Sequence, residues 1–176
     1  MHDPEMDTLD AIRSRRDVRE YADRPIDPQH LRMILEAGRR APSSSNWQPW
    51  DFVVVTDRET LGQLADVQRG ARHVASSAVT IALVAPVPMD GVQRDRVQYD
   101  LGQATMSIML AAADLGIGSA HAAVSDPGPV HTILGLPADR FCGYLIPLGY
   151  PADRRLAPIT RPNRRPLDEV VHCQGW

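Results

Sequence analysis

The sequence is poor in several residue types, and each shortage narrows what the protein can be. It contains no lysine, so all 19 basic residues are arginines, and the formal net charge is −3. Nucleic-acid binding proteins normally carry a basic excess or a basic stripe, so this class is not expected. Aromatic residues make up only 5% of the chain against 43% hydrophobic residues, which predicts an aliphatic core.

Cysteine is also scarce. Cys142 and Cys173 lie far apart in the sequence, and the six histidines show no ligand spacing, so neither a disulfide framework nor a metal site is expected. The first residues are acidic and polar, unlike a signal peptide, and no apolar run approaches the roughly 20 residues of a membrane span. We therefore expect a cytoplasmic protein without a membrane partner.

The common catalytic motifs are missing as well. No GxSxG, HExxH, GxGxxG or P-loop pattern occurs in the chain. A chain without its own nucleophile, metal or acid–base pair can still be an enzyme if a cofactor supplies the chemistry. The question is then which cofactor the polar clusters of this sequence suit.

The length of 176 residues predicts a single domain, 1–176. Asp27-Pro28 and Asp57 are typical of helix starts, with aspartate as the N-cap, and Asp126-Pro127 is typical of a turn or a cap ahead of a helix. Spacing and β-branched runs predict helices at 7–16, 28–41, 93–115 and 129–135, a further helix carrying Leu61 and Leu64, and strands at 52–55, 79–84, 117–122 and 144–148. The order of these elements does not choose between a parallel and a mixed sheet.

Residues 151–166 are rich in proline and arginine and show no periodicity. They predict an extended arm that leads to a short apolar segment, 167–171. An arm with so little core of its own must lie against another surface, and a partner subunit is the obvious candidate.

Two arginine groups stand near the ends of the chain. One runs from Arg13 to Arg19, and the other comprises Arg161, Arg164 and Arg165. Guanidinium groups pair with phosphate oxygens in a bidentate manner, so both groups suit a bound phosphate. The alternative is that these arginines are simply solvated.

A third polar cluster, Ala41–Trp50, reads APSSSNWQPW and lies between a predicted helix and a predicted strand. Its hydroxyl and amide groups could hydrogen-bond a flat heteroaromatic ring. The alternative is an ordinary serine-rich loop whose hydroxyls satisfy nearby backbone groups.

Together these segments resemble the FMN-dependent nitroreductase family. Residues 15–19, RRDVR, are similar to its RRSxR phosphate motif, and residues 41–50 are similar to its APSxxNxQPW loop. The helix end at 115–118, LGIG, and the closing segments 148–151 and 164–171 follow the family in order and spacing. The resemblance therefore spans nearly the whole chain.

The resemblance implies an α+β fold, with a mixed, mostly antiparallel sheet flanked by helices, in a homodimer whose C-terminal arms are exchanged. FMN would lie at the interface, and NADH or NADPH would supply hydride. The phosphate and ribityl chain would contact Arg15, Arg16, Asp17, Arg19, Arg161 and Arg164. The ring would contact Pro42, Ser43, Ser44 and Asn46, from the partner subunit, and Ala122, Ala123 and Val124 near its reactive N5.

Two further residues have implied roles with open alternatives. Arg72 would lie near the pyrimidine edge of the flavin, where a cation favours the reduced ring, but it could equally be a solvated helix arginine. His121 could be a donor in the substrate pocket or an ordinary structural histidine at a strand end.

Three functions follow from the resemblance. The first is hydride transfer from NAD(P)H to a nitroaromatic, a quinone or a similar acceptor by a ping-pong mechanism, with no catalytic side chain beyond the flavin. The second is a flavin-fragmenting 5,6-dimethylbenzimidazole synthase, because Asp17 stands where the commoner motif has serine. The third is an FMN-binding or sensing module without turnover. Related enzymes that have a substrate lid carry a longer segment between the second predicted strand and the long helix. Here the link, 86–92, is short. This favours an open site and therefore the first function.

Overall fold

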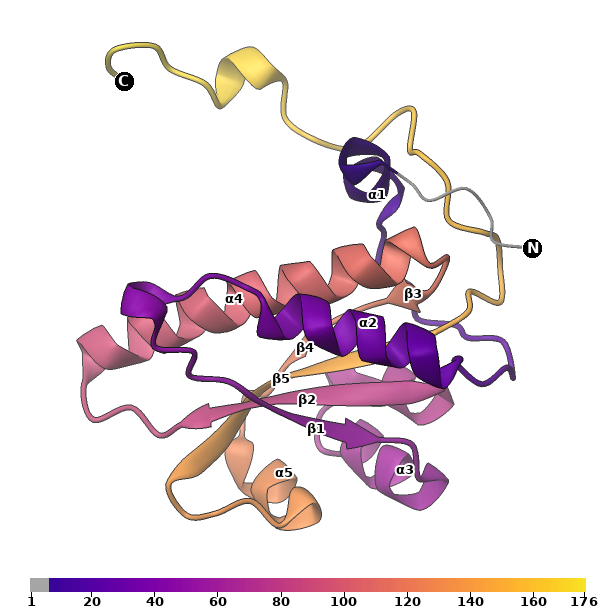
Figure 1. Ribbon diagram of the computed structural model, residues 1–176, viewed down its shortest axis with the longest axis vertical. Helices are drawn as coiled ribbons and strands as arrows, with labels where there is room; N and C mark the ends of the chain where they lie inside the picture. The colour runs from indigo at the N-terminus through magenta and orange to yellow at the C-terminus, as the bar shows by residue number, and fades with distance from the viewer. Residues whose placement is uncertain (1–6) are drawn as a thin grey trace.

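A five-stranded sheet runs through the centre of residues 7–176, which are the residues that the computed structural model describes (Figure 1). The strands are β1 (Asp51–Val55), β2 (Val79–Pro86), β3 (Gly118–Ser119), β4 (Ala122–Ala123) and β5 (Arg140–Gly149). Their order is β1-β2-β5-β3, with β4 also paired to β5, and every one of these pairs is antiparallel. The order of elements had left the sheet type open, and the structure decides it.

Helices cover both faces of the sheet. They are α1 (Thr8–Ser14), α2 (Pro28–Arg39), α3 (Arg58–Asp66), α4 (Gly91–Asp114) and α5 (Pro127–Leu134), with short 3₁₀ helices at Ser44–Asn46, Arg69–Ser76 and Leu167–Glu169. The long helix α4 and α2 pack together on one face, whereas α3 and α5 lie on the other (Figure 1). None of the described helices is long and apolar enough to cross a membrane.

Strand β2 illustrates why both faces must be covered. Val79, Ile81, Leu83 and Ala85 belong to the core beneath α2 and α4, and the intervening Ala82 and Val84 belong to the core on the α3 side. Successive side chains of a strand point to opposite faces. An uninterrupted apolar run therefore requires an apolar layer on each side.

The helix starts predicted at Asp27 and Asp57 are confirmed, and Asp126 is a cap, although α5 begins at Pro127 rather than at residue 129. Asp27, Asp57 and Asp126 each accept a hydrogen bond from a backbone N–H in the first turn of α2, α3 and α5, respectively. Such N-caps satisfy donors that the helix itself cannot. The end of α4 is also as expected, because Gly116 follows it with a φ of +69°.

Several regions differ from the predictions. The helix expected at 7–16 ends at Ser14, so Arg15 and Arg16 lie in extended chain, and the strand expected at 144–148 begins at Arg140. The strand expected at 117–122 is divided into β3 and β4, and the gap faces Pro147 of β5, which has no N–H to donate to the ladder. The 3₁₀ helix at Arg69–Ser76 was not predicted. Its buried residues, Ala71 and Val74, are three positions apart, as expected for one face of a 3₁₀ helix. Two residues are too few to predict such a helix from the sequence.

The N-terminal segment after α1 docks against the sheet. Val18 N–H donates to the Ser119 carbonyl at 2.9 Å, and Asp17 and Ser119 form an isolated parallel bridge. The fit is close: a Cβ added at Gly118 would lie 2.7 Å from the Val18 side chain, and one at Gly149 would lie 2.8 Å from Tyr21. These two glycines let the segment that carries the basic motif lie directly against β3 and β5.

The C-terminal arm is extended, as expected. It follows the N-terminal segment at first, with Ala152 N–H donating to the Glu20 carbonyl and Ile159 N–H to the Arg13 carbonyl. From residue 160 onward every residue is exposed, and the arm leads away from the helices and the sheet (Figure 1). A single domain over 1–176 stays a prediction, because residues 1–6 lie outside the described part of the chain.

Candidate functional site

The basic motif has two sides. Arg15 Nη1 lies 3.4 Å from Asp17 Oδ1, and Arg19 Nη2 lies 3.4 Å from Asp17 Oδ2. In extended chain, residues two positions apart point to the same side. Both arginines are thus held by one carboxylate, which leaves the group with excess positive charge.

Arg16 points to the other side. Its Nη2 lies 2.6 Å from Asp153 Oδ1 and donates to the Arg154 carbonyl at 2.9 Å, and only 17% of its side chain is exposed. Arg16 lowers the pKa of the Asp153 carboxyl through this hydrogen bond. Within the single chain, Arg16 therefore fastens the start of the C-terminal arm. Its predicted contact with the phosphate stays a prediction.

His73 lies within electrostatic range of Asp17, and His121 lies within range of His73. Burial lowers the pKa of His73, Arg19 lowers it further, and Asp17 acts in the opposite direction, with His121 also close enough to contribute. The Nε2 atom of His73 is buried and has no hydrogen-bond partner among the described residues. We call Arg15, Asp17, Arg19, His73 and His121 the Asp17 cluster. Separate segments of the chain converge on it.

The strand segment beyond His121 is held from outside the sheet. Gln68 donates through Nε2 to the Ala123 carbonyl and accepts from the backbone N–H and the hydroxyl of Ser125, at 3.1 and 2.8 Å. His121 is exposed, and its ring meets that of Tyr144 edge-on at a centroid distance of 6.3 Å. The predicted ring-contacting segment 122–124 thus follows the cluster directly.

The loop that follows α2 has an unusual backbone. Ser45, Asn46 and Gln48 have φ values of 51°, 55° and 52°, in the left-handed region. For residues with a side chain this region costs about 1–2 kcal/mol each, so other contacts must hold the loop in place. Ser43 Oγ accepts from Gln48 N–H at 2.8 Å, and the carboxylate of Asp100 on α4 accepts from Ser44 N–H at 3.0 and 3.2 Å.

The loop and the basic motif do not meet within one chain. The loop is attached to α4 at Asp100, whereas the basic motif lies beside Ser119, shortly after α4 ends at Asp114. Between Asp100 and Asp114 the helix rises about 21 Å. The two predicted halves of the site are therefore separated along α4, one beside its first half and the other beyond its C-terminal end.

The remaining predicted residues are on the surface. Six of them are exposed: Pro42, Asn46, Arg72, Ala123, Arg161 and Arg164. Ser43, Ser44 and Val124 are partly exposed, and Ala122 is buried. The hydrogen bonds of Arg164 stay within the arm. The structure thus brings Arg15, Asp17, Arg19, His121 and the 122–124 segment together and leaves the loop and the arm apart from them.

Three residues that shape this region were missed from the sequence: Gln68, His73 and Asp100. Only Asp100 had a usable signal. It falls between Val97 and Leu101 on the apolar face of the long helix. An acidic residue is rarely buried there unless a partner satisfies its carboxylate. Gln68 and His73 belong to an irregular segment that has no such pattern.

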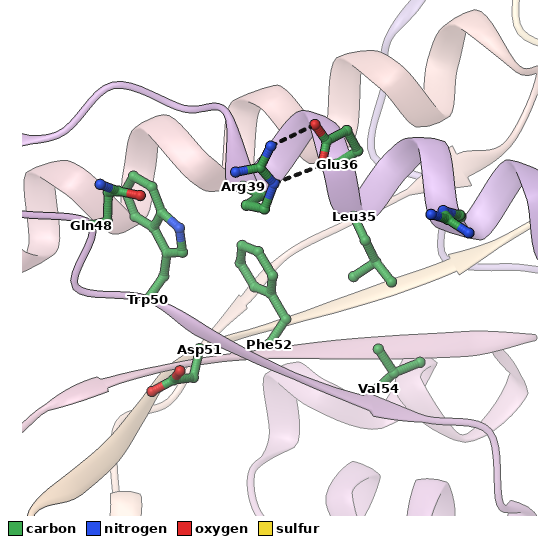
Figure 2. Close-up of a pocket in the computed structure, with 9 residues that line it drawn as sticks. Leu35, Glu36, Arg39, Gln48, Trp50, Asp51, Phe52 and Val54 are labelled. Carbon is green, nitrogen blue, oxygen red and sulfur yellow. Dashed lines mark hydrogen bonds and ion pairs between the residues drawn. The ribbon is translucent and has the colours of Figure 1, made fainter. Parts of the chain in front are cut away.

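A groove of about 780 Å³ lies elsewhere, between α2 and the edge strand β1 (Figure 2). Phe52 points from β1 toward α2, where Glu36 and Arg39 form an ion pair of 2.7 Å. Of the predicted FMN-binding residues, none lines this groove. Within residues 7–176, β1 pairs only with β2, so the outer edge of β1 is open beside the groove.

Comparison with known proteins gives the site its context. The sequence model of the Nitroreductase family matches residues 12–80. A protein of Archaeoglobus fulgidus, named as a candidate NADH dehydrogenase/NAD(P)H nitroreductase, is 33% identical over 172 residues, which cover 96% of this chain and 98% of that protein. The 5,6-dimethylbenzimidazole synthase of Rhodospirillum rubrum is 31% identical over 86% of both chains.

The fold is also similar to that of solved structures. The structure of NADPH:FMN oxidoreductase from Vibrio harveyi in complex with NAD⁺ superimposes with a TM-score of 0.82 at 26% identity. The superposition covers 96% of this chain and 77% of that one. The sheet, the helices on both its faces and the order of elements are thus shared with a flavin oxidoreductase.

Proposed function

This chain belongs to the nitroreductase family, and from that premise we propose that it is an FMN-dependent oxidoreductase. It takes hydride from NADH or NADPH and reduces a small oxidised acceptor, such as a nitroaromatic or a quinone. The observation that carries the proposal is the convergence of Arg15 and Arg19 on Asp17, beside the 122–124 segment.

The residues of the Asp17 cluster suit FMN. Two guanidinium groups share one carboxylate, which leaves a net charge of +1, and Arg161 and Arg164 from an arm would balance the rest of the phosphate charge of about −1.5 to −2. In this proposal Arg15 and Arg19 bind the phosphate and ribityl chain with Arg161 and Arg164 from an arm, and Arg16 holds the arm in place.

Bound FMN supplies a ring that carries hydride between a nicotinamide and an acceptor. The chain would contribute the surroundings: the 122–124 segment would line the ring, with Ala122, whose side chain is buried, contributing its backbone, and Arg72 would lie at the edge of the ring. No lid covers this region, because the link between β2 and α4 is short. The nicotinamide and the acceptor therefore use the same face in turn, and His121 is placed to donate a hydrogen bond there.

A homodimer would complete the site. Val92, Tyr99 and Met106 are exposed and recur every seven residues on α4, and a Cβ at Gly102 would meet no atom of residues 7–176 within 4 Å. Apolar residues at this spacing form a seam for a second helix. Two α4 helices packed antiparallel along it would bring the loop of one subunit to the Asp17 cluster of the other.

The arm also has a place in this dimer. Leu167, Val170 and Val171 are exposed, and the groove beside β1 is lined by Leu35, Trp50, Phe52 and Val54 among others. An extended segment can add to an open sheet edge and insert alternate side chains into pockets beside it. We propose that the arm of one subunit lies in the groove of its partner.

One observation supports a second function. Asp17 stands between two arginines where the commoner family motif has serine, and a relative of this chain is named 5,6-dimethylbenzimidazole synthase. In such an enzyme Asp17 would take part in the fragmentation of reduced FMN. In a reductase it orients Arg15 and Arg19 or accepts a hydrogen bond from a ribityl hydroxyl.

The first prediction is ping-pong kinetics. Initial rates of NAD(P)H oxidation, measured at several fixed concentrations of a quinone or a nitroaromatic, should give parallel double-reciprocal lines because one face serves both substrates. Intersecting lines would mean that both substrates bind together. Protein that holds FMN but oxidises neither nicotinamide would instead support a binding or sensing module.

The second prediction concerns the phosphate. A hydrogen bond to a charged group contributes about 1.5–3 kcal/mol, and about 1.4 kcal/mol is tenfold in affinity. Arg15→Ala should therefore weaken FMN roughly tenfold to a hundredfold in a fluorescence titration and leave riboflavin, which has no phosphate, almost unaffected. Arg13→Ala, an exposed arginine of α1, is the matched control. Equal loss of FMN and riboflavin would contradict the assignment.

The third prediction concerns assembly. The protein should have the mass of two chains by light scattering and contain about one FMN per subunit. Met106→Glu, which places a charge in the α4 seam, should yield monomers that no longer retain FMN. Met33→Glu on α2 is the control, because Met33 and Met106 are equally exposed, at 44% and 45%. A Met106→Glu dimer with full FMN content would refute the proposed seam.

The fourth prediction separates the two enzymes. Asp17→Ser should keep FMN bound and leave NAD(P)H oxidation within roughly tenfold of wild type, the effect of one modest hydrogen bond. Wild-type protein incubated with reduced FMN and oxygen should form no dimethylbenzimidazole, as judged by mass spectrometry. If that product appears and Asp17→Ser abolishes it, the synthase assignment replaces the reductase.

A further inference from the structure

One buried acidic residue, Asp100, has no part in the cofactor contacts of the proposed function. Asp100 is completely inaccessible on the face of α4 that packs into the core, between Val97 and Leu101. Its carboxylate accepts hydrogen bonds from the backbone N–H of Ser44 at 3.0 and 3.2 Å and from the Ser44 hydroxyl at 3.3 Å. Gln103, one turn further along the helix, donates to it at 3.4 Å.

Burying a carboxylate is costly unless donors satisfy it, and an apolar residue would fill the same space without that cost. The main donor to Asp100 is the loop at 43–48. The other side-chain hydrogen bonds of this loop are internal, from Gln48 N–H to Ser43 Oγ and from Gln48 Nε2 to the Asn46 carbonyl at 3.1 Å. The bond to Asp100 therefore fixes where the loop sits on α4.

The backbone of the loop makes this attachment important. Three of its residues have left-handed φ values, and such a conformation persists only where the surroundings hold it. Ser44, which Asp100 holds, comes directly before Ser45, the first of the three. Loss of the Asp100 bond would release the loop at the start of its strained part.

We propose that Asp100 is a positioning residue, which holds the 43–48 loop in the conformation that binds FMN and so sets FMN affinity without touching the cofactor. This inference rests on the proposed function. Because the loop is assigned to the site of the partner subunit, Asp100 acts on the FMN that its partner binds.

The test uses Asp100→Ala, Asp100→Asn and, as a control on the same helix, Asp95→Ala, whose parent side chain is 76% exposed. In the FMN-free protein, Asp100→Ala should speed amide hydrogen exchange at Ser44–Gln48 by about tenfold or more, the effect of one lost hydrogen bond to a charged group. The rest of α4 and the sheet should exchange at wild-type rates.

The FMN dissociation constant should rise in the variants in which hydrogen exchange of the loop is faster. We expect it to rise about tenfold or more in Asp100→Ala and to stay near the wild-type value in Asp95→Ala. The amide carbonyl of Asp100→Asn can still accept from Ser44 N–H. This variant should therefore restore both slow exchange and FMN affinity to within about threefold of wild type, since one direct acceptor is retained.

Several outcomes would overturn the inference. Faster exchange throughout α4 and the sheet in both Asp100 variants would show a role in general stability. Wild-type FMN affinity in Asp100→Ala would remove the link to the cofactor and leave the proposed function intact. A wild-type protein that binds no FMN would overturn the proposed function and this inference together.

Discussion

The pairing of β2 with β5 is the contact on which the rest of the structure depends. These two strands are the longest of the sheet, and each has an apolar core against both of its faces. Because neither face can be left to water, α2 and α4 must lie on one side and α3 and α5 on the other. Strand β5 also pairs with β3 and β4, and through β3 it carries the N-terminal segment with the basic motif. The position of the Asp17 cluster thus follows from the central ladder.

The length of α4 imposes a second constraint. One helix of 24 residues carries the loop anchor, Asp100, in its first half and ends beside the segment that docks the basic motif. The helix keeps these two points about 21 Å apart, so under the proposed function one chain holds two incomplete half-sites. The exposed residues Val92, Tyr99 and Met106 along the same helix provide the surface through which a second copy could join them. Site assembly and subunit association are, in this view, one event.

The basic motif shows how neighbouring residues of the same type acquire different tasks. Arg15 and Arg16 are adjacent, yet Arg15 faces Asp17 while Arg16 lies against Asp153 at the start of the arm. Extended backbone turns alternate side chains to opposite sides. One arginine therefore lies on the side of Asp17, and the next one ties the N-terminal segment to the start of the arm. A partly buried guanidinium with a short ion pair is expected to matter more for the arm than an exposed pair would.

The sequence by itself determined the local features. Aspartate caps, the apolar spacing of α4 and the β-branched runs of β1 and β2 act over a few residues, so their signals are visible without the fold. The APSSSNWQPW and RRDVR segments likewise identified the family and the residue types of the site. Only the tertiary structure decided that the sheet is antiparallel, that Pro147 divides β3 from β4, and that Arg16 pairs with Asp153 rather than facing the cluster. It also revealed that the buried Asp100 holds the 43–48 loop and that His73 lies within electrostatic range of Asp17. The reason is that these contacts join residues far apart in the sequence, and local patterns carry no information about which distant segment will fill the other side.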